Sequence, residues 1–320
     1  MQFGSCSEFA DWCPKSEVET CDLVCPGWYC SGEYLAWRLR PQGLDYAIAA
    51  EEVETAVGVG TVENVEFSRD AGYRLGLGYV TQTGWDLGFR YTSFDTDQTA
   101  SAAAPALGTP AEGTLWATRS HPSVNEEADT AIANAALDYQ TFDFEIGRWF
   151  EVNRFTAIRV MGGLRWLSAD QQLLIQYDGG QFDEGVVRDQ ITNQAFGIRV
   201  GAEGHWKMWG GWSAFARGIG SVAYTRSDLR LLETNRTGQA GQTLIVDISD
   251  RFTAPATNLE AAVGLSWKRG SWGISGGYEM THWLNLSNRT TFDGVHAGAY
   301  NPVAMDLLLE GMFFSVAYSH

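Results

Sequence analysis

Charged side chains recur at alternate positions of several segments, each flanked by strongly apolar neighbours. In an enclosed channel such side chains would form a charged lining that selects ions. In a narrow barrel they would instead pair with one another and fill the lumen. The residues alone leave both interpretations open. The predicted lumen positions are Arg38, Arg74, Asp86, Arg90, Arg159, Arg165, Arg199, Glu203, Arg217, Glu260 and Glu279.

Catalytic chemistry finds little support among the histidines. Only His282, beside Thr281 and Trp283, is placed like a catalytic residue, near the outer rim of the predicted barrel. A lone rim histidine is more often a surface residue than a base. The sequence contains no GxSxG, HExxH or glycine-rich phosphate motif. We therefore expect no enzyme activity, no cofactor and no metal site. An outer-membrane hydrolase is kept only as the last of three functional hypotheses.

All five cysteines lie in the first tenth of the chain, and 290 residues follow without another. Clustered cysteines in a short polar segment predict disulfides in an oxidising compartment. A zinc site is disfavoured, because no histidine is near and no paired CxxC spacing occurs. The odd number leaves one thiol that could link subunits or stay free. The predicted disulfide residues are Cys6, Cys13, Cys21, Cys25 and Cys30, within a periplasmic N-terminal segment of residues 1–32.

Composition restricts the class of protein further. The 320 residues carry a net charge of −17, and so acidic a surface repels nucleic acid. The contents of 45% hydrophobic and 13% aromatic residues exclude a disordered chain. No run of eighteen apolar residues predicts a membrane-spanning helix. The 36 glycines and 13 tryptophans point to β structure.

Period-two alternation is the main structural signal. In AGYRLGLGYV, Tyr73, Leu75, Leu77 and Tyr79 share one face, whereas Arg74 and two glycines share the other. A soluble sandwich would favour Lys, Thr and Glu on its polar face, although patterning does not exclude such a fold. Apolar faces bounded by tryptophans, opposite a face of Gly and Arg, are typical of a transmembrane barrel with a polar lumen.

The spacing of turns predicts about ten antiparallel strands over residues 33–320, in an up-and-down barrel. Twelve are possible if residues 43–50 or 242–248 pair separately. In LDYQTFDFEIGRW the apolar face switches at Thr141, which would need a bulge. Short turns are predicted at 81–84, 151–154, 207–211 and 268–271, and longer loops at 51–66, 97–129, 177–189, 233–242 and 288–301.

Three blocks resemble a known family. RDAGYRLGLGYVTQTGWDLGFRYTSF, LDYQTFDFEIGRWF and FTAIRVMGGLRW are similar to pore-forming outer-membrane proteins related to the Legionella major outer-membrane protein, a group also common in planctomycete-type bacteria. The resemblance implies a Gram-negative outer membrane, passive permeation and oligomers, some of them disulfide-linked. The Cys-rich segment lies outside these blocks.

The leading hypothesis is therefore a porin-like outer-membrane β-barrel without catalysis, passing ions or small solutes. The second is a structural or lattice-forming envelope protein whose lumen is plugged. The expected partners are outer-membrane lipid and further copies of the chain.

Overall fold

The computed structural model describes residues 26–50, 60–106, 113–122, 126–236, 241–292 and 300–320. These residues form fourteen strands and the turns between them. Among them, no helix is long and apolar enough to cross a membrane. The strands are β1 (Gly27–Pro41), β2 (Asp45–Ala50), β3 (Thr61–Asn64), β4 (Arg69–Val80), β5 (Trp85–Ala103), β6 (Thr114–Ala117), β7 (Glu127–Ala128), β8 (Thr130–Asn153), β9 (Thr156–Gly179), β10 (Phe182–Lys207), β11 (Trp212–Arg236), β12 (Gln242–Arg269), β13 (Trp272–Phe292) and β14 (Tyr300–Ser319).

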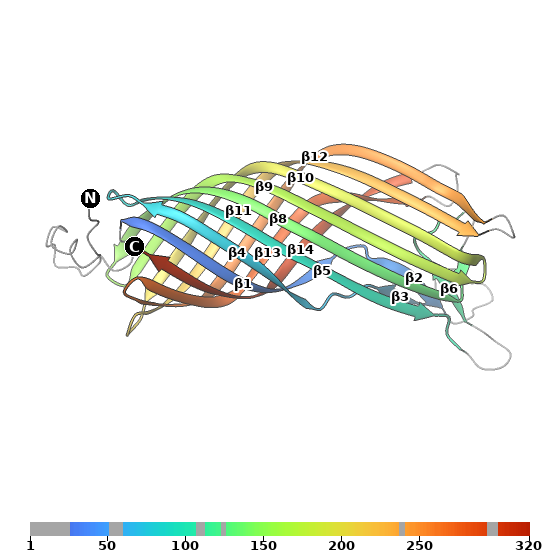
Figure 1. Cartoon of the computed structure of the whole chain (residues 1–320), viewed down its shortest axis with the longest axis horizontal. Coiled ribbons are helices and arrows are strands. Elements are labelled where there is room, and N and C mark those ends of the chain that lie inside the picture. The colour runs from blue at the N-terminus through green and yellow to red at the C-terminus, as the bar shows by residue number, and fades with distance from the viewer. Residues whose placement is uncertain (1–25, 51–59, 107–112, 123–125, 237–240, 293–299) are drawn as a thin grey trace.

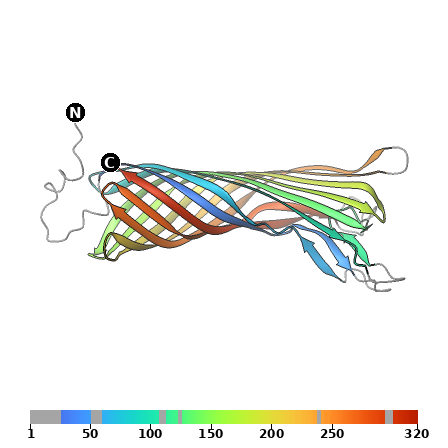
Figure 2. The same ribbon diagram turned by 60° about the horizontal axis from the view of Figure 1, so that its bottom comes forward.

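Ten strands close into an antiparallel barrel, which confirms the predicted fold class and strand number (Figure 1). The ring order is β1-β14-β13-β12-β11-β10-β9-β8-β5-β4, and β4 pairs again with β1. Neighbouring strands of the ring also follow one another in sequence, except for three pairs: β1 with β4, β5 with β8, and β1 with β14. The other four strands form a small separate sheet in the order β3-β2-β6-β7, seen beside the barrel in Figure 2.

The barrel is much longer than a membrane is thick. Strands β8 to β12 contain 24 to 28 residues each, whereas about 9–11 tilted residues cross a bilayer. Tight turns connect these strands at one end, which we call the short-turn end. One example is the turn between β10 and β11, where Gly211 has a φ of 84° that favours glycine. The strands therefore continue well past any membrane at the opposite end.

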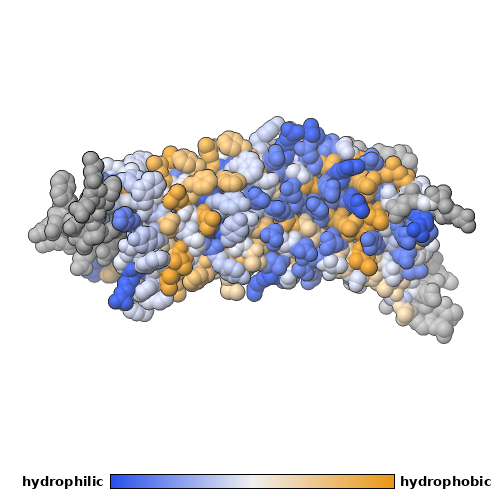
Figure 3. Space-filling model, viewed as in Figure 1, coloured by the Kyte–Doolittle hydropathy of each residue, from blue (hydrophilic) through white to orange (hydrophobic). Residues whose placement is uncertain are grey.

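An outward-facing apolar belt surrounds the half of the barrel nearest the short-turn end (Figure 3). Aromatic side chains border it on both sides, as the interfacial girdles of a membrane barrel require. Near the turns the border includes Trp28, Tyr79, Trp85, Trp212, Trp272 and Tyr318. The far border includes Tyr73, Tyr91, Phe142 and Trp166, whose rings contact one another in that order at centroid distances of 6.0, 4.6 and 5.4 Å.

Beyond the belt the two faces of each strand exchange character. On β8, Phe142, Phe144 and Ile146 face outward within the belt, while Asn134 and Asp138 face outward beyond it. The inward face changes in the opposite sense. Pairing of β8 with β5 and β9 is continuous through Thr141. The predicted bulge at Thr141 is therefore wrong, because the pattern inverts where the barrel leaves the membrane and no residue is inserted.

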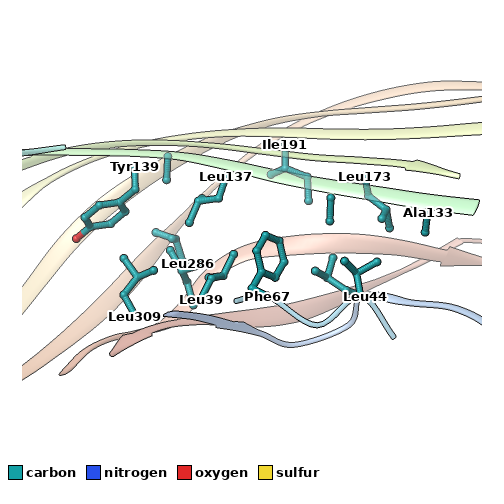
Figure 4. Close-up of a cluster of buried hydrophobic side chains, with 14 of the residues drawn as sticks. Leu39, Leu44, Phe67, Ala133, Leu137, Tyr139, Leu173, Ile191, Leu286 and Leu309 are labelled. Atoms are coloured by element: carbon teal, nitrogen blue, oxygen red, sulfur yellow. The ribbon is translucent and has the colours of Figure 1, made fainter. Parts of the chain in front are cut away.

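The part beyond the belt, which we call the cap, is a closed apolar core rather than a continuous ring. Strands β12 and β13 pair only as far as Thr257 and Leu284, because a bulge between Trp283 and Ser287 diverts β13. There β13 packs across the interior against β10 and β11. Figure 4 shows the result: Leu137, Tyr139, Leu173 and Ile191 on one side face Leu39, Phe67, Leu286 and Leu309 on the other.

Several predicted loops are shorter than expected. Residues 177–189 form a tight hairpin between β9 and β10, because Gly179 and Gly180 both adopt positive φ. The predicted loop 97–129 begins only after Ala103, where β5 ends. Residues 242–248 belong to β12, and β2 lies in the small sheet, so neither adds a strand to the ring.

The N-terminal cysteines fall on both sides of the described boundary. Cys30 lies within β1, on the outer face next to Trp28 at the short-turn end, and its side chain is exposed. The first ring strand thus begins at Gly27, before the predicted boundary at residue 33. The predictions for Cys6, Cys13, Cys21 and Cys25 lie outside the described residues.

Candidate functional site

The structure places ten of the eleven predicted lumen residues inside the barrel, within the membrane half. Their side chains are only 2–18% exposed, so none lines an open aqueous space. Three further carboxylates, Glu33, Asp143 and Glu145, face them. Together the six arginines and seven carboxylates form the ionic layer. Its members are Arg74, Arg90, Arg159, Arg165, Arg199, Arg217, Glu33, Asp86, Asp143, Glu145, Glu203, Glu260 and Glu279.

The best-defined contact of the ionic layer joins β9 to β8. Arg165 donates two parallel hydrogen bonds to Asp143, from Nε to Oδ1 at 2.6 Å and from Nη2 to Oδ2 at 2.7 Å. Such bidentate pairs are short and strongly directional. The same guanidinium reaches across the lumen to Glu260 on β12, which also accepts a bond of 3.1 Å from Arg199. The pairs therefore bridge opposite walls of the barrel.

A second group of contacts lies on the β1 and β13 side. Arg74 binds Glu33 at 2.7 Å and Glu279 at 2.9 Å, and Arg217 binds Glu279 at 3.0 Å. The indole Nε1 of Trp37 also donates to Glu279, at 3.1 Å. Trp37 is buried against Phe94 and Tyr139 above this carboxylate. The ionic layer is thus fastened to the apolar core of the cap.

Nearest the short-turn end, Arg159 binds Asp86 at 2.7 Å and Glu145 at 3.3 Å. Tyr29 of β1 donates a hydrogen bond of 2.8 Å to the same Asp86. Gly147 makes room for the arginine, since a Cβ there would lie 2.8 Å from its Nε. A glycine beside an arginine on the inward face therefore indicates close packing of the lumen, and this explains the Gly and Arg pattern of the sequence.

Large apolar side chains close the barrel immediately above the ionic layer. Trp37, Tyr139 and Trp283 are fully buried, and Trp283 Nε1 donates to the Tyr139 hydroxyl at 3.1 Å. Trp283 also lies over the Arg165 guanidinium, at 5.9 Å from the ring centroid. The interior is therefore filled first by ion pairs and then by hydrocarbon and aromatic rings. Such an arrangement stabilises the barrel, and solute passage would require its rearrangement.

Two predicted positions lie elsewhere. Arg38 shares the outward face of β1 with the exposed Tyr34 and is 3.7 Å from Glu66, so its predicted lumen position is wrong. The alternation of this segment correctly predicts a strand, but it does not define which face of the strand points inward. His282 also faces outward, 3.5 Å from Asp306 of β14. It is therefore separated from the ionic layer by the barrel wall.

The carboxylates Asp143, Glu145 and Glu33 were missed from the sequence. Asp143 and Glu145 alternate with Phe142, Phe144 and Ile146 in the usual way. Their inward direction is not evident from the sequence, because the same face of β8 is apolar on the other side of Thr141, at Leu137 and Tyr139. Glu33 is the first residue of the predicted barrel, and it lies directly opposite Arg74 in the pairing of β1 with β4.

Comparison with known proteins agrees with this architecture. The family model described as Legionella pneumophila major outer membrane protein precursor matches residues 23–320. No curated protein sequence matches the chain. Outer membrane protease OmpT from Escherichia coli has a similar fold, with a TM-score of 0.50 and 9% identity over 94% of this chain and 100% of that chain.

Two further solved barrels align over most of their length but superpose poorly. A Pseudomonas aeruginosa FadL homologue has a TM-score of 0.26 and 7% identity, covering 92% of this chain and 89% of its own. The Pseudomonas putida toluene transporter TodX has a TM-score of 0.27 and 7% identity, covering 94% and 91%. At these identities the similarities concern the fold alone. The TM-scores of the FadL homologue and of TodX are too low to support any functional argument.

Proposed function

Because this chain belongs to the family of the Legionella pneumophila major outer membrane protein, we propose that it is a structural protein of the outer membrane whose barrel has a closed lumen. The belt anchors the chain in the membrane, and the cap extends from it on the side away from the short turns. In outer-membrane barrels short turns are periplasmic, so the cap is displayed at the cell surface. The sequence offers this plugged barrel as its second hypothesis, and we prefer it here over an open pore.

The filled interior carries this proposal. A ten-stranded barrel is only slightly wider than barrels that side chains fill completely. Here the arginines of the ionic layer bridge opposite walls, as Arg165 does between Asp143 and Glu260. Buried ion pairs of this kind are costly to break, because one partner is left charged and unpaired. Trp37, Tyr139 and Trp283 add an apolar layer that excludes hydrated ions.

Passive permeation of ions is the second candidate. It is favoured by two buried nitrogen atoms of the lumen, Arg159 Nε and Asn258 Nδ2, which lack hydrogen-bond partners among the described residues. Buried polar atoms of this type usually bind water. A wet ionic layer could pass ions if the arginines exchanged carboxylate partners and the aromatic layer moved aside.

Planar-bilayer recording separates the two candidates. The purified, folded protein is expected to insert without producing stable conductance steps. Steps of uniform size would contradict the closed barrel and support permeation. If steps appear, Arg165→Glu tests whether the ion current passes through this lumen. A shift toward cation selectivity would assign the current to this barrel, whereas unchanged selectivity would assign it to a contaminating porin.

A hydrolase is the least supported of the three candidates, and it would depend on His282. The His282–Asp306 pair lies on the outer face, where a soluble substrate in the lumen could not reach it. We propose that His282→Ala leaves the protein functionally unchanged.

We also propose that the chain forms homo-oligomers, because the odd number of cysteines leaves one thiol for a bond between subunits. Mass measurement in detergent, with and without reductant, tests this.

A further inference from the structure

Three arginines gather on the outer face of the barrel immediately beyond the far border of the belt. Arg38 and Arg40 face outward on β1, and Arg69 is the first residue of β4. On the same faces, nearer the membrane, lie the exposed rings of Tyr34 and Tyr73. The arginines thus occupy the level at which hydrocarbon gives way to lipid headgroups.

These arginines are only partly neutralised by their surroundings. Arg38 and Arg69 are directly opposite in the pairing of β1 with β4, an arrangement in which like charges destabilise a sheet. Arg40 pairs with Glu310, and Arg38 has only Glu66, at 3.7 Å and largely exposed. Within the described residues, Arg69 has no ion pair, and Nε of Arg38 is buried without a hydrogen-bond partner.

The cluster brings three arginines together on an acidic chain. Several other outward arginines of the cap have carboxylates on their own or neighbouring strands. Arg226 lies 3.4 Å from Asp228, and Arg230 lies 3.7 Å from Asp247. A surplus of positive charge at one place on a chain of net charge −17 indicates an anionic partner.

The arginines also border a hollow in the outer surface. Its volume is about 420 Å³. We call it the arginine groove. Its lining combines charged, hydroxyl and aromatic groups: Arg38, Arg40, Phe67, Ser68, Arg69, Tyr278 and Glu310. The groove can therefore surround a charged group while an attached apolar chain passes down the belt.

We propose that the arginine groove binds a phosphate group of an anionic glycolipid in the outer leaflet. The planar guanidinium forks of Arg38 and Arg69 match phosphate oxygens and relieve their mutual repulsion once the anion lies between them. The acyl chains of the same lipid would lie against Tyr34, Tyr73 and the aliphatic residues below. Because the site is on the outside of the barrel, this proposal is independent of whether the lumen is open.

Binding of a bisphosphorylated lipid A to detergent-solubilised protein, measured by native mass spectrometry, tests the proposal. The double variant Arg38→Gln/Arg69→Gln should bind at least about tenfold more weakly, because two charge-assisted contacts are lost. The matched control Arg226→Gln/Arg230→Gln alters two outward arginines with acidic partners and should bind as the unchanged protein does. A difference in gel mobility between boiled and unboiled samples verifies that each variant is folded. If the double variant does not fold, Arg69→Gln alone replaces it, and a smaller loss of lipid binding is then expected.

Two ligand controls identify the source of the phosphate. Lipid A stripped of both phosphates should bind the unchanged protein no better than the intact lipid binds the double variant. Inorganic phosphate at millimolar concentration should not displace the lipid, because it lacks the acyl chains. Equal lipid binding by both proteins, full retention of the dephosphorylated lipid, or saturation of the groove by inorganic phosphate would each overturn the proposal.

Discussion

Tyr139 and Asp143 point from the same face of β8 into the same barrel, yet their surroundings are opposite in kind. Asp143 accepts two hydrogen bonds from Arg165 within the ionic layer. Tyr139 lies among apolar side chains and accepts a single bond from Trp283. Both are buried. Thr141 lies between them, at the level where the inward face of the barrel changes from charged to apolar and the outward face changes from apolar to polar.

Replacement of Arg165 should strongly destabilise the barrel. Arg165→Gln leaves Asp143 and Glu260 buried with less compensation, and breaking a buried ion pair costs about 3–5 kcal/mol. Urea unfolding in detergent measures the loss. Arg188→Gln is the control, because Arg188 is exposed on the outer face of β10. Equal stability of the two variants would mean that the ionic layer is hydrated and loosely paired.

The border of the belt can be tested on the outward face of β8. Phe144→Arg places a charge in the hydrocarbon and should cost about 2–4 kcal/mol. Gln140→Arg, four residues further along the same face, lies beyond Phe142 and should cost little. Folding into lipid vesicles, followed by urea titration, compares the two. Similar costs would place the membrane border further toward the cap.

The apolar closure above the ionic layer should tolerate no large truncation. Trp283→Ala removes a fully buried ring, and substitutions of this type cost about 3–5 kcal/mol. Trp209→Ala removes the same side chain from a turn where it is 79% exposed and provides the control. The melting temperature in detergent should fall for the first variant and remain for the second. If both remain, the cap core contributes little to barrel stability.

Glu233 predicts a pH dependence of the cap. Burial raises the pKa of this carboxyl above its ordinary value, despite hydrogen bonds from Ser120 Oγ and the His121 amide. In the window between the unfolded and folded pKa values the native state binds more protons, so its stability falls as pH rises through that window. Glu233→Gln should abolish this slope and stabilise the cap at neutral pH. Protease resistance of the cap, measured from pH 4 to pH 8, records the difference.

Asp228 provides a control of opposite sign. Hydrogen bonding to Arg251 lowers the pKa of this exposed carboxyl. Its contribution is therefore present above the unfolded pKa and is lost as pH falls through the folded value. Asp228→Asn should weaken the cap slightly at neutral pH and make no difference in acid. A neutral-pH stabilisation by both substitutions would contradict the assignment for Glu233.

The predicted disulfides are tested by counting thiols. Alkylation of the oxidised, denatured protein should modify at most one of the five cysteines, and reduction should expose all five. If the unmatched thiol is Cys30, which is exposed on β1, then Cys30→Ser should remove any reductant-sensitive oligomer. Five reactive thiols before reduction would contradict the prediction.

Strand number and belt were predictable because alternation is a local property. Tyr73, Leu75, Leu77 and Tyr79 recur every second residue, and a β-strand places such residues on one face whatever its neighbours. The direction of that face is not local. Arg38 alternates with apolar residues just as Arg74 does, yet it faces outward, because beyond the belt the apolar residues belong inside.

The partners within the site were beyond sequence reasoning for a related reason. Asp143 and Glu260 meet at Arg165 only because the closed ring brings β12 across from β8 and β9. The hairpin at Gly179 and Gly180 was open to prediction, since two adjacent glycines favour a tight turn. The polar residues around them suggested a long loop instead, although they are the outward face of two cap strands.

Pairing of β1 with β14 joins the two extremes of the ring, with Tyr29 opposite Ser319. The entropy of closing so long a loop must be overcome before that contact contributes anything, and such distant contacts make folding slow. Until β14 arrives, β1 and β13 each present an unpaired edge that can capture a strand of another chain. The order in which the strands insert into the membrane therefore decides whether β14 pairs with β1 of its own chain or β1 pairs with a strand of another chain.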